Sequence, residues 1–485
     1  MFRLRNALAA AAVCVAGAAT SVQADVVTDW NQTYLEAVRV NGGPPCPASR
    51  WCTHLYVAMF DAANSVYGDY EPIVTKIPVT QPTSARAAIA AAAHRMLIHA
   101  YPTQQALFDQ AYANTMSNIP PSMARARGIK LGRQVADAVI AARQGDGSDD
   151  FTPYPQQNGP GRYVLTELDI FDSPATPNWG KVKPWAMTKG SQFRPTAPGG
   201  FKSWVRLLQS QYYADQLNEV KELGARNSGT RTQDQTDIAW FWANDVDGTS
   251  KPPGQLLQIT QTAAVDHGLD FYKKARLFAL VSVAMGDACI AGWDAKYLTW
   301  CDLWRPITAI RQADTDNNPA TDADPTWEPL APWTPPFPAY ISGHATFAGA
   351  HAAILRNYFR TDNLALDVYT DDPHYTGPLP RHYTNLTDMA RENGRSRIYL
   401  GVHYQFDADQ GFVVGTAVGN NAFDKIARPV CSADFDKNGF VDASDMSRFS
   451  DAFFASDPKC DFDKNGVLDN NDLFDFLDAY NGGCN

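Results

Sequence analysis

The sequence predicts an all-α protein, a large helical bundle followed by a small acidic module. Apolar residues recur at helical spacing through most of residues 25–425, and Pro-, Gly- and Asn-rich loops separate these segments. Residues 431–485 hold twelve Asp against four Lys or Arg, so much of the net charge of -11 lies there. A chain of 485 residues with 45% hydrophobic residues can bury a large core and add a second, smaller unit.

The first 24 residues have the pattern of a secretory signal peptide. Arg3 and Arg5 precede an Ala- and Val-rich stretch over residues 7–19, and Val22-Gln23-Ala24 forms a small-x-small cleavage site before Asp25. An N-terminal core helix is the alternative interpretation. We expect cleavage after Ala24 and a secreted or periplasmic mature protein.

Long helices are expected along the body of the chain. The most apolar stretch, 277–293, contains Asp287, and no other stretch after the signal is long and apolar enough to span a membrane, so we expect no membrane span. The periodic segments with the strongest helical pattern are 84–98, 122–143, 201–223, 231–244, 271–292, 345–358 and 388–408.

Two long loops interrupt the helical pattern, at 145–184 and 314–338. The second is rich in proline and leads directly into Ser342-Gly343-His344, so we expect it to form one wall of a pocket. Ser342 and Gly343 would then stand at the N-terminus of the helix 345–358. Backbone N–H donors and the helix dipole favour an anion at such a position.

Seven cysteines remain after removal of the signal, and an exported protein can keep disulfides. Cys46 and Cys52 flank a short Pro-containing segment and are the expected disulfide. Cys289 and Cys301 are expected to be buried thiols. The remaining connectivity is open from the sequence.

One group of residues has the chemistry of an oxyanion pocket. Two arginines and a lysine supply fixed positive charge, a Ser-Gly-His turn supplies backbone and hydroxyl donors, and one histidine remains to contact the bound centre. That histidine, His403, lies four residues before Asp407, which can hold its ring on one helical face. A histidine satisfied on a helix surface is the plainer interpretation of this pair alone. The cations are Lys296, Arg305 and Arg397.

These elements resemble the signature of the superfamily that contains vanadium-dependent haloperoxidases and type 2 phosphatidic acid phosphatases, over residues 230–420. The resemblance implies a helical bundle of that type over residues 25–427. It also implies His403 as the axial vanadate ligand or phosphatase nucleophile and His344 as the acid/base residue. The spacing between the lysine and the first arginine is longer than in the family pattern. The oxyanion contacts that the resemblance implies are Lys296, Arg305, Ser342, Gly343 and Arg397.

Two aromatic residues favour the haloperoxidase branch of this superfamily. Trp293 and Phe337 resemble the pair that lines the halide pocket of chloroperoxidase-type members, although each also suits an ordinary core. The preferred function is a secreted vanadate-dependent haloperoxidase that uses hydrogen peroxide and halide, with the bound metal acting as a Lewis acid, to make hypohalous acid equivalents. One alternative is a soluble acid phosphatase that acts on a phosphate ester through a phosphohistidine on the same residues. Another is a scaffold-binding protein with a degenerate catalytic domain.

The C-terminal module, residues 428–485, contains a 27-residue repeat with the ligand spacing of calcium loops. Oxygen ligands fall at loop positions 1, 3, 5, 9 and 12, with Gly at position 6 and a backbone carbonyl at position 7. Asp at position 12 resembles dockerin repeats, which implies a cohesin-like or cell-surface partner. The acidity argues against nucleic acid. The expected calcium ligands are Asp434, Asp436, Asn438, Phe440, Asp442 and Asp445 in the first loop, and Asp461, Asp463, Asn465, Val467, Asp469 and Asp472 in the second.

Overall fold

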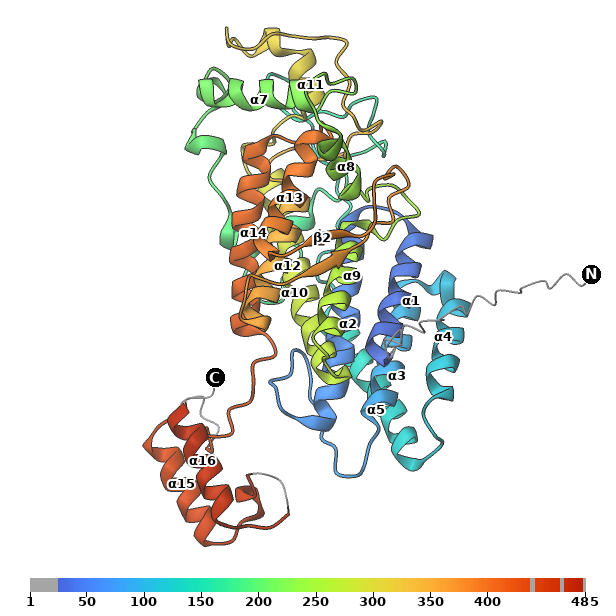
Figure 1. Ribbon diagram of the computed structural model, residues 1–485, viewed down its shortest axis with the longest axis vertical. Helices are drawn as coiled ribbons and strands as arrows, with labels where there is room; N and C mark the ends of the chain where they lie inside the picture. The colour runs from blue at the N-terminus through green and yellow to red at the C-terminus, as the bar shows by residue number, and fades with distance from the viewer. Residues whose placement is uncertain (1–24, 437–440, 463–465, 483–485) are drawn as a thin grey trace, which may run out of the picture.

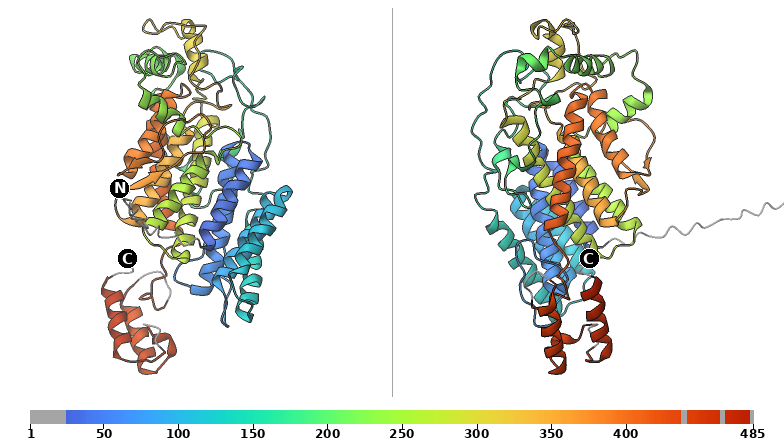
Figure 2. Two further views of the ribbon diagram at one scale, coloured as in Figure 1. Left: turned by 45° about the vertical axis from the view of Figure 1, so that its right-hand side comes forward. Right: turned by 90° about the vertical axis from the view of Figure 1, so that its left-hand side faces the viewer.

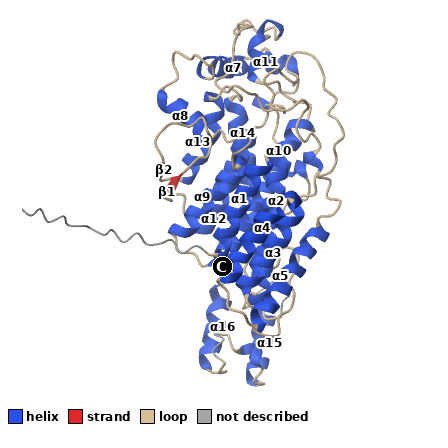
Figure 3. Cartoon of the chain, turned by 90° about the vertical axis from the view of Figure 1, so that its right-hand side faces the viewer, coloured by secondary structure: helices blue, strands red, loops and turns tan. Residues whose placement is uncertain are grey.

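The structure is a computed structural model that describes residues 25–436, 441–462 and 466–482. The expected signal peptide therefore lies outside the described residues, as do the expected calcium ligands Asn438, Phe440, Asp463 and Asn465. Helices dominate the described chain, with a single two-stranded sheet, and the all-α prediction is confirmed (Figures 1 and 3).

The N-terminal part of the bundle is a group of five long helices in which α2 packs against α3 and α10. The alanine-rich α3 also lies close against α5, because Gly132 of α5 faces it. A Cβ at this glycine would stand 2.0 Å from the carbonyl oxygen of Ala88. The elements are α1 (Val26–Asn41), α2 (Pro45–Tyr67), α3 (Ala85–Ala100), η1 (Pro102–Gln104), α4 (Gln105–Ser117) and α5 (Met123–Ala142).

The middle of the chain is more broken than the sequence pattern predicted. The expected helix 201–223 is two helices, because Ser203 and Ser210 each cap a new helix by accepting a backbone N–H. The expected helix 231–244 ends early, at Phe241. The elements are η2 (Trp179–Lys181), η3 (Gly190–Phe193), η4 (Pro198–Gly200), α6 (Trp204–Leu208), α7 (Gln211–Leu223), α8 (Gln233–Phe241) and α9 (Lys251–Asp266).

A second group of helices encloses α10, the most buried helix of the bundle. Among the described helices α10 alone is long and apolar enough to cross a membrane, and 94% of its most apolar window is buried in the fold, as expected of a core helix. The elements are α10 (Phe271–Tyr297), α11 (Pro306–Arg311), η5 (Ala313–Thr315), α12 (Gly343–Phe359), β1 (Leu366–Val368), β2 (Arg381–Tyr383), α13 (Leu386–Tyr399) and α14 (Gln405–Lys425). The antiparallel strands pair Asp367 with His382.

The expected single helix 388–408 is wrong: the chain forms α13 and α14 with a short link between them. Gly401 in this link has φ +82°, a left-handed conformation that suits glycine and ends the helix. His403 therefore lies in the link and not on the helix that carries Arg397. The break turns the chain so that His403 and Arg397 line the same cavity.

The C-terminal segment forms a helical pair with its own small core. The rings of Phe449 and Phe476 stack with centroids 3.8 Å apart, beside the buried Ala433 and Cys460. Figures 1 and 2 show this pair apart from the main bundle, joined to it by one extended segment. The elements are α15 (Ala443–Phe454), η6 (Pro458–Cys460) and α16 (Asn470–Gly482). The domain division between residues 427 and 428 stays a prediction.

The expected disulfide between Cys46 and Cys52 is wrong. Residues 45–67 form the continuous helix α2 with Pro45 at its first turn, and both cysteines are buried free thiols. Cys46 instead contacts Cys289 of α10, with the two Sγ atoms 3.2 Å apart. Cys289 and Cys301 are buried thiols, as predicted. In the C-terminal segment, Cys431 is disulfide-bonded and Cys460 is a buried free thiol.

Candidate active site

The predicted oxyanion residues come from five separate elements. Lys296, Arg305 and Ser342 are not among the cavity-lining residues, although Nη1 of Arg305 contacts His403. The other predicted residues line one cavity. Its lining includes Trp293, Gly343, His344, Arg397 and His403. The positively charged residues stand at helix ends: Lys296 in the last turn of α10, Arg305 at the N-cap of α11 and Arg397 in the last turn of α13.

His403 is fixed in one tautomer by its two neighbours. Nε2 lies 3.1 Å from Nη1 of Arg305, and a guanidinium can only donate, so Nε2 is the unprotonated nitrogen. Nδ1 then donates to Oδ2 of Asp407 at 2.8 Å. Burial and the surrounding cations hold the pKa of His403 well below its usual value. The ring is therefore neutral, with a lone pair directed toward the cations.

Asp407 is the orienting residue predicted from the sequence. It stands in the first turn of α14 and reaches back to His403, and its Oδ2 also accepts the backbone N–H of Tyr404 at 3.0 Å. Burial raises the pKa of this carboxyl to about 7, although Lys296 and Arg305 act in the opposite direction.

The buried cations are anchored on backbone carbonyls. Lys296 donates to the carbonyls of Pro338 and Ala339 at 2.7 and 3.1 Å, and Arg305 donates to those of Phe337 and Val402 at 2.7 Å. Burial, followed by the neighbouring guanidinium, lowers the pKa of Lys296 well below its usual value, and burial lowers the pKa of Arg305 to about 10. The longer spacing between these two residues does not separate them, because Nζ of Lys296 and Cζ of Arg305 each lie 4.8 Å from the centre of the Phe337 ring.

The Ser342-Gly343-His344 turn opens α12 at the cavity. Ser342 is the N-cap residue, and Gly343 is the first residue of the helix. A Cβ at Gly343 would stand 3.5 Å from the ring of Trp293, in ordinary contact. His344 Nε2 lies 3.2 Å from the carbonyl oxygen of Ala243, and burial with the nearby Arg397 lowers its pKa to about 4.

An apolar wall stands beside the charged residues. The rings of Trp293 and Phe337 lie 5.0 Å apart, and Nζ of Lys296 lies 4.8 Å from the centre of the Phe337 ring. The Pro-rich segment 314–338 contributes Pro335 and Phe337 to the lining, so it forms part of the wall.

Sequence reasoning missed Asp245, which lines the cavity and forms an ion pair with Arg397. The side chain of Arg397 is 1% exposed and that of Asp245 is 12% exposed. The early end of α8 leaves residues 242–250 as a loop, and this loop carries Asp245 to the cavity. Its surroundings, Asn244-Asp245-Val246-Asp247-Gly248, resemble an ordinary polar turn and contain no signal that could have singled it out.

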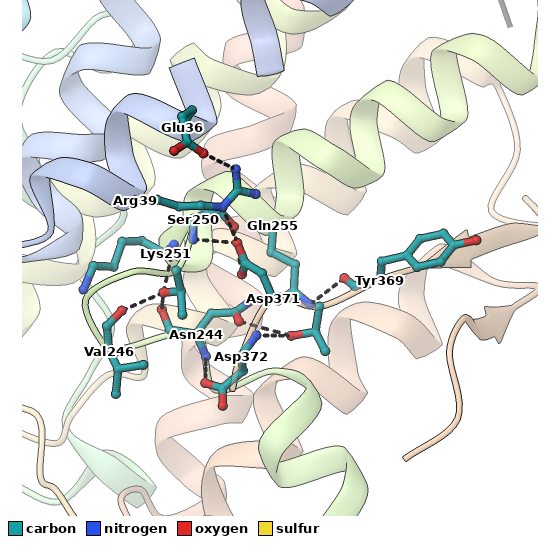
Figure 4. A network of polar contacts seen from close by, with 12 residues as sticks. Glu36, Arg39, Asn244, Val246, Ser250, Lys251, Gln255, Tyr369, Asp371 and Asp372 are labelled. Carbon is teal, nitrogen blue, oxygen red and sulfur yellow. Dashed lines mark hydrogen bonds and ion pairs between the residues drawn. The ribbon is translucent and has the colours of Figure 1, made fainter. Parts of the chain in front are cut away.

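A network of polar contacts fixes the loop that carries Asp245 (Figure 4). Asp372 accepts the backbone N–H of Asn244 at 2.9 Å, and Asp371 accepts that of Ser250 at 2.8 Å. Asp371 is in turn paired with Arg39 of α1 at 2.9 Å. The segment that follows β1 therefore ties the loop to the first helix and holds Asp245 beside Arg397.

The cavity has the donors and charge to hold a tetrahedral oxyanion. Within the described chain, Nη2 of Arg305 and both Nε and Nη1 of Arg397 are buried without a hydrogen-bond partner. Buried polar groups are almost always paired, so unsatisfied guanidinium donors beside an unprotonated histidine nitrogen indicate a missing anionic partner. Vanadate and phosphate both fit this donor set.

The C-terminal loops carry a second candidate site. Carboxylate oxygens of Asp434, Asp436 and Asp445 lie within 4.8 Å of one another. In each loop the position-12 carboxylate accepts the position-9 backbone N–H: Asp445 accepts that of Asp442 at 2.9 Å, and Asp472 accepts that of Asp469 at 2.8 Å. The two loops thus repeat one local geometry.

Comparison with known proteins finds similarity over the helical bundle. Residues 276–431 match the family model described as the VCPO second helical-bundle domain. The chain is 29% identical to a vanadium chloroperoxidase of Curvularia inaequalis over 78% of each protein. It is also 29% identical to a vanadium-dependent bromoperoxidase of Ascophyllum nodosum over 26% of this chain and 24% of that one.

Solved structures share the fold. A bacterial vanadium-dependent iodoperoxidase superposes with a TM-score of 0.71 at 24% identity, covering 83% of this chain and 96% of that one. A holo-type bacterial vanadium-dependent chloroperoxidase superposes with a TM-score of 0.60 at 18% identity, covering 84% and 94%. Fold and pocket together define a helical bundle built around a buried oxyanion site. The relatives found by sequence and by fold are vanadium haloperoxidases.

Proposed function

We propose that this chain is a vanadate-dependent haloperoxidase that oxidises halide with hydrogen peroxide to hypohalous acid equivalents. The observation that carries the proposal is the neutral His403, whose unprotonated Nε2 stands among buried cations with unsatisfied donors. The similarity to the chloroperoxidase and bromoperoxidase supports the same chemistry.

The proposed roles follow from the contacts. His403 would bind the metal through Nε2, while Lys296, Arg305 and Arg397, together with Ser342 and Gly343, would hold the vanadate oxygens. When bound, vanadate supplies a Lewis acid that activates peroxide without a change in its own oxidation state.

The protein's own residues would position and move protons. Asp407 keeps the proton of His403 on Nδ1 and so keeps Nε2 available. His344, whose pKa is about 4, is neutral near pH 7 and can accept a proton through the ring nitrogen that does not bond to Ala243. The three cations offset negative charge that develops on the oxygens.

The apolar wall favours halide oxidation over phosphate ester hydrolysis. Trp293 and Phe337 offer a weakly hydrated surface next to Lys296, which suits a large, polarisable halide ion. The acid phosphatase remains a second candidate because a histidine oriented by a carboxylate also suits a nucleophile that forms a phosphohistidine.

A paired assay distinguishes the haloperoxidase function from the phosphatase function. The purified mature protein would receive orthovanadate, hydrogen peroxide and bromide or chloride with a dione reporter, beside a vanadate-free p-nitrophenyl phosphate assay. We expect vanadate-dependent halogenation that His403→Ala abolishes and that His382→Ala, a change at an exposed histidine, leaves intact. Phosphate release inhibited by vanadate, without halogenation, would move the protein to the phosphatases. Neither activity would favour a scaffold-binding protein with a degenerate catalytic domain.

We further propose that the C-terminal module binds two calcium ions and docks to a cohesin-like or cell-surface partner. The repeated position-12 contacts and the cluster of Asp434, Asp436 and Asp445 support calcium. Titration calorimetry on the parent should give two sites, with one lost in each of Asp445→Ala and Asp472→Ala. Binding of calcium by neither loop would contradict the proposal.

Export of the mature protein is also proposed. Asp25, the residue after the expected cleavage site, caps α1 and pairs with Lys274 at 2.6 Å, so the expected first residue of the mature protein is held in the bundle. N-terminal sequencing of the exported protein should begin at Asp25. A start at Met1 would contradict cleavage.

A further inference from the structure

Two buried thiols meet beside the active-site cavity. Cys46 lies in the first turn of α2 and Cys289 lies on α10, 243 residues further along the chain. Their Sγ atoms are 3.2 Å apart, and their residues are 0% and 1% exposed. A disulfide joins sulfur atoms about 2 Å apart, so a small movement of these side chains would close the pair.

The two thiols lie next to residues that line the cavity. Pro45, the neighbour of Cys46, lines the cavity, and so does Trp293, one helical turn after Cys289. The hydroxyl of Thr176 donates to the sulfur of Cys46 at 3.2 Å, which holds this thiol toward its partner. The two helices that place the wall residues are therefore the same two that carry the thiols.

We propose that Cys46 and Cys289 are a modification site, a dithiol that the enzyme's own hypohalous acid oxidises to a disulfide. One thiol takes the halogen as RSH + HOX → RSX + H₂O, and the second sulfur displaces halide as RSX + R′SH → RSSR′ + HX. The two sulfurs each lose one electron, and the halogen returns to halide. This inference rests on the proposed haloperoxidase function for its oxidant, whereas the pairing rests on the sulfur contact alone.

The surroundings of Cys46 favour this oxidant over a milder one. Burial raises the pKa of Cys46 well above its usual value, so this sulfur is a thiol and not a thiolate near neutral pH. Peroxide and disulfide reagents react mainly with thiolates. A strongly electrophilic halogen reacts with the neutral thiol, and the proposed reaction would produce it in the cavity that Pro45 and Trp293 line.

The cross-link would fix the distance between two residues that line the cavity. It would tie the first turn of α2 to the last third of α10 and so hold Pro45 and Trp293 at a constant separation. Because it would close a very long loop, it should also raise the Tm of the bundle.

The test uses the full-length chain, made in a reducing cytosol and shown to carry both thiols free. Three portions receive stoichiometric hypobromite, hydrogen peroxide alone, or vanadate with peroxide and bromide, and peptide mapping by mass spectrometry follows without reduction. We expect a peptide that joins Cys46 to Cys289 and lacks two hydrogens after hypobromite and after turnover, but not after peroxide alone. The parent should also gain Tm under the two cross-linking conditions.

Variants make the outcome specific. Cys46→Ser and Cys289→Ser should each abolish the cross-linked peptide. Cys301→Ser, which removes another buried thiol of the bundle, should form it as the parent does.

Other outcomes separate the two hypotheses. Cross-linking by hypobromite but not during turnover would overturn the haloperoxidase assignment and support the pair. Thiols that stay free or gain oxygen atoms under hypobromite would overturn the pairing. A cross-link formed equally well by peroxide alone would overturn hypohalous acid as the required oxidant.

Discussion

The active-site cavity and the C-terminal module gather charges of opposite sign, and they gather them from different distances along the sequence. The cavity gathers buried cations from elements far apart in the sequence and leaves three of their nitrogens unpartnered within the described chain. The module gathers carboxylates from within short loops and repeats the sequence pattern after 27 residues. The cavity is therefore built by the whole fold, whereas each acidic loop is built by its own few residues.

This difference predicts how each region fails. Charges buried in the bundle depend on fixed partners, because removal of one partner leaves the other unpaired in a poorly solvated place. Under the proposed calcium binding, the state of the loop carboxylates should follow the calcium concentration. A single buried substitution should thus disturb the bundle, and a chelator should disturb the module.

The largest effect is expected at the ion pair between Asp245 and Arg397. Asp245→Ala leaves the guanidinium buried beside two other cations, and we expect a loss of about 3–5 kcal/mol in the unfolding free energy of the bundle. Urea unfolding followed by tryptophan fluorescence reports it, because the module from residue 428 onward contains no tryptophan. Vanadate should restore part of the loss by supplying the missing negative charge.

The matched change in the other region is Arg448→Ala. Arg448 is 67% exposed and lies 3.5 Å from Asp436, whose side chain is 7% exposed. Because the guanidinium itself is solvated, its removal should cost no more than about 1 kcal/mol. Equal losses of unfolding free energy for the two variants would contradict the expectation that the bundle depends more strongly on its ion pair.

The second largest effect is the loss of calcium from the module. A ligand at roughly one hundred times its Kd stabilises the folded state by about 2.7 kcal/mol, so chelation should lower the Tm of the module and leave that of the bundle unchanged. Differential scanning calorimetry with and without a chelator would resolve the two transitions. A bundle transition that moves as far as that of the module would argue that the two regions unfold together.

The same contrast explains what the sequence could predict. The repeated acidic-loop contacts and the His403–Asp407 contact depend on spacings of a few residues, and the predicted histidine contact forms even though the predicted helix does not. The break at Gly401 was missed because apolar periodicity continues across it. Asp245 reaches Arg397 from 152 residues away in the sequence, and Cys46 reaches Cys289 from 243 residues away, so only the three-dimensional packing brings these pairs together.

A third prediction concerns the acid sensitivity of the bundle, to which the buried His351 contributes. His351 is buried in α12 beside Thr260, and burial lowers its pKa from 6.5 to about 3. Above pH 6.5 the ring is neutral in both states. Between these two pKa values only the unfolded chain binds the proton, so stability falls as pH falls, by about 2 kcal/mol at pH 5.

The variant His351→Gln should remove this component. The difference in unfolding free energy between parent and variant should shrink by about 2 kcal/mol from pH 7 to pH 5. His382→Gln, at a histidine whose side chain is 73% exposed, serves as the control and should show no such change. A pH-independent difference for His351→Gln would mean that the buried ring does not resist protonation.

The smallest effect concerns the carboxylate that orients His403. Asp407→Asn keeps the size of the side chain but removes its charge and weakens its hold on the Nδ1 proton, so vanadate affinity should fall about tenfold or somewhat more. Equilibrium vanadate titration by thermal shift measures this. Asp409→Asn, at an exposed carboxylate two residues further along α14, should bind as the parent does. Unchanged affinity in Asp407→Asn would mean that the link between α13 and α14 fixes the His403 ring by itself, and the site would then depend on backbone geometry more than on its buried charges.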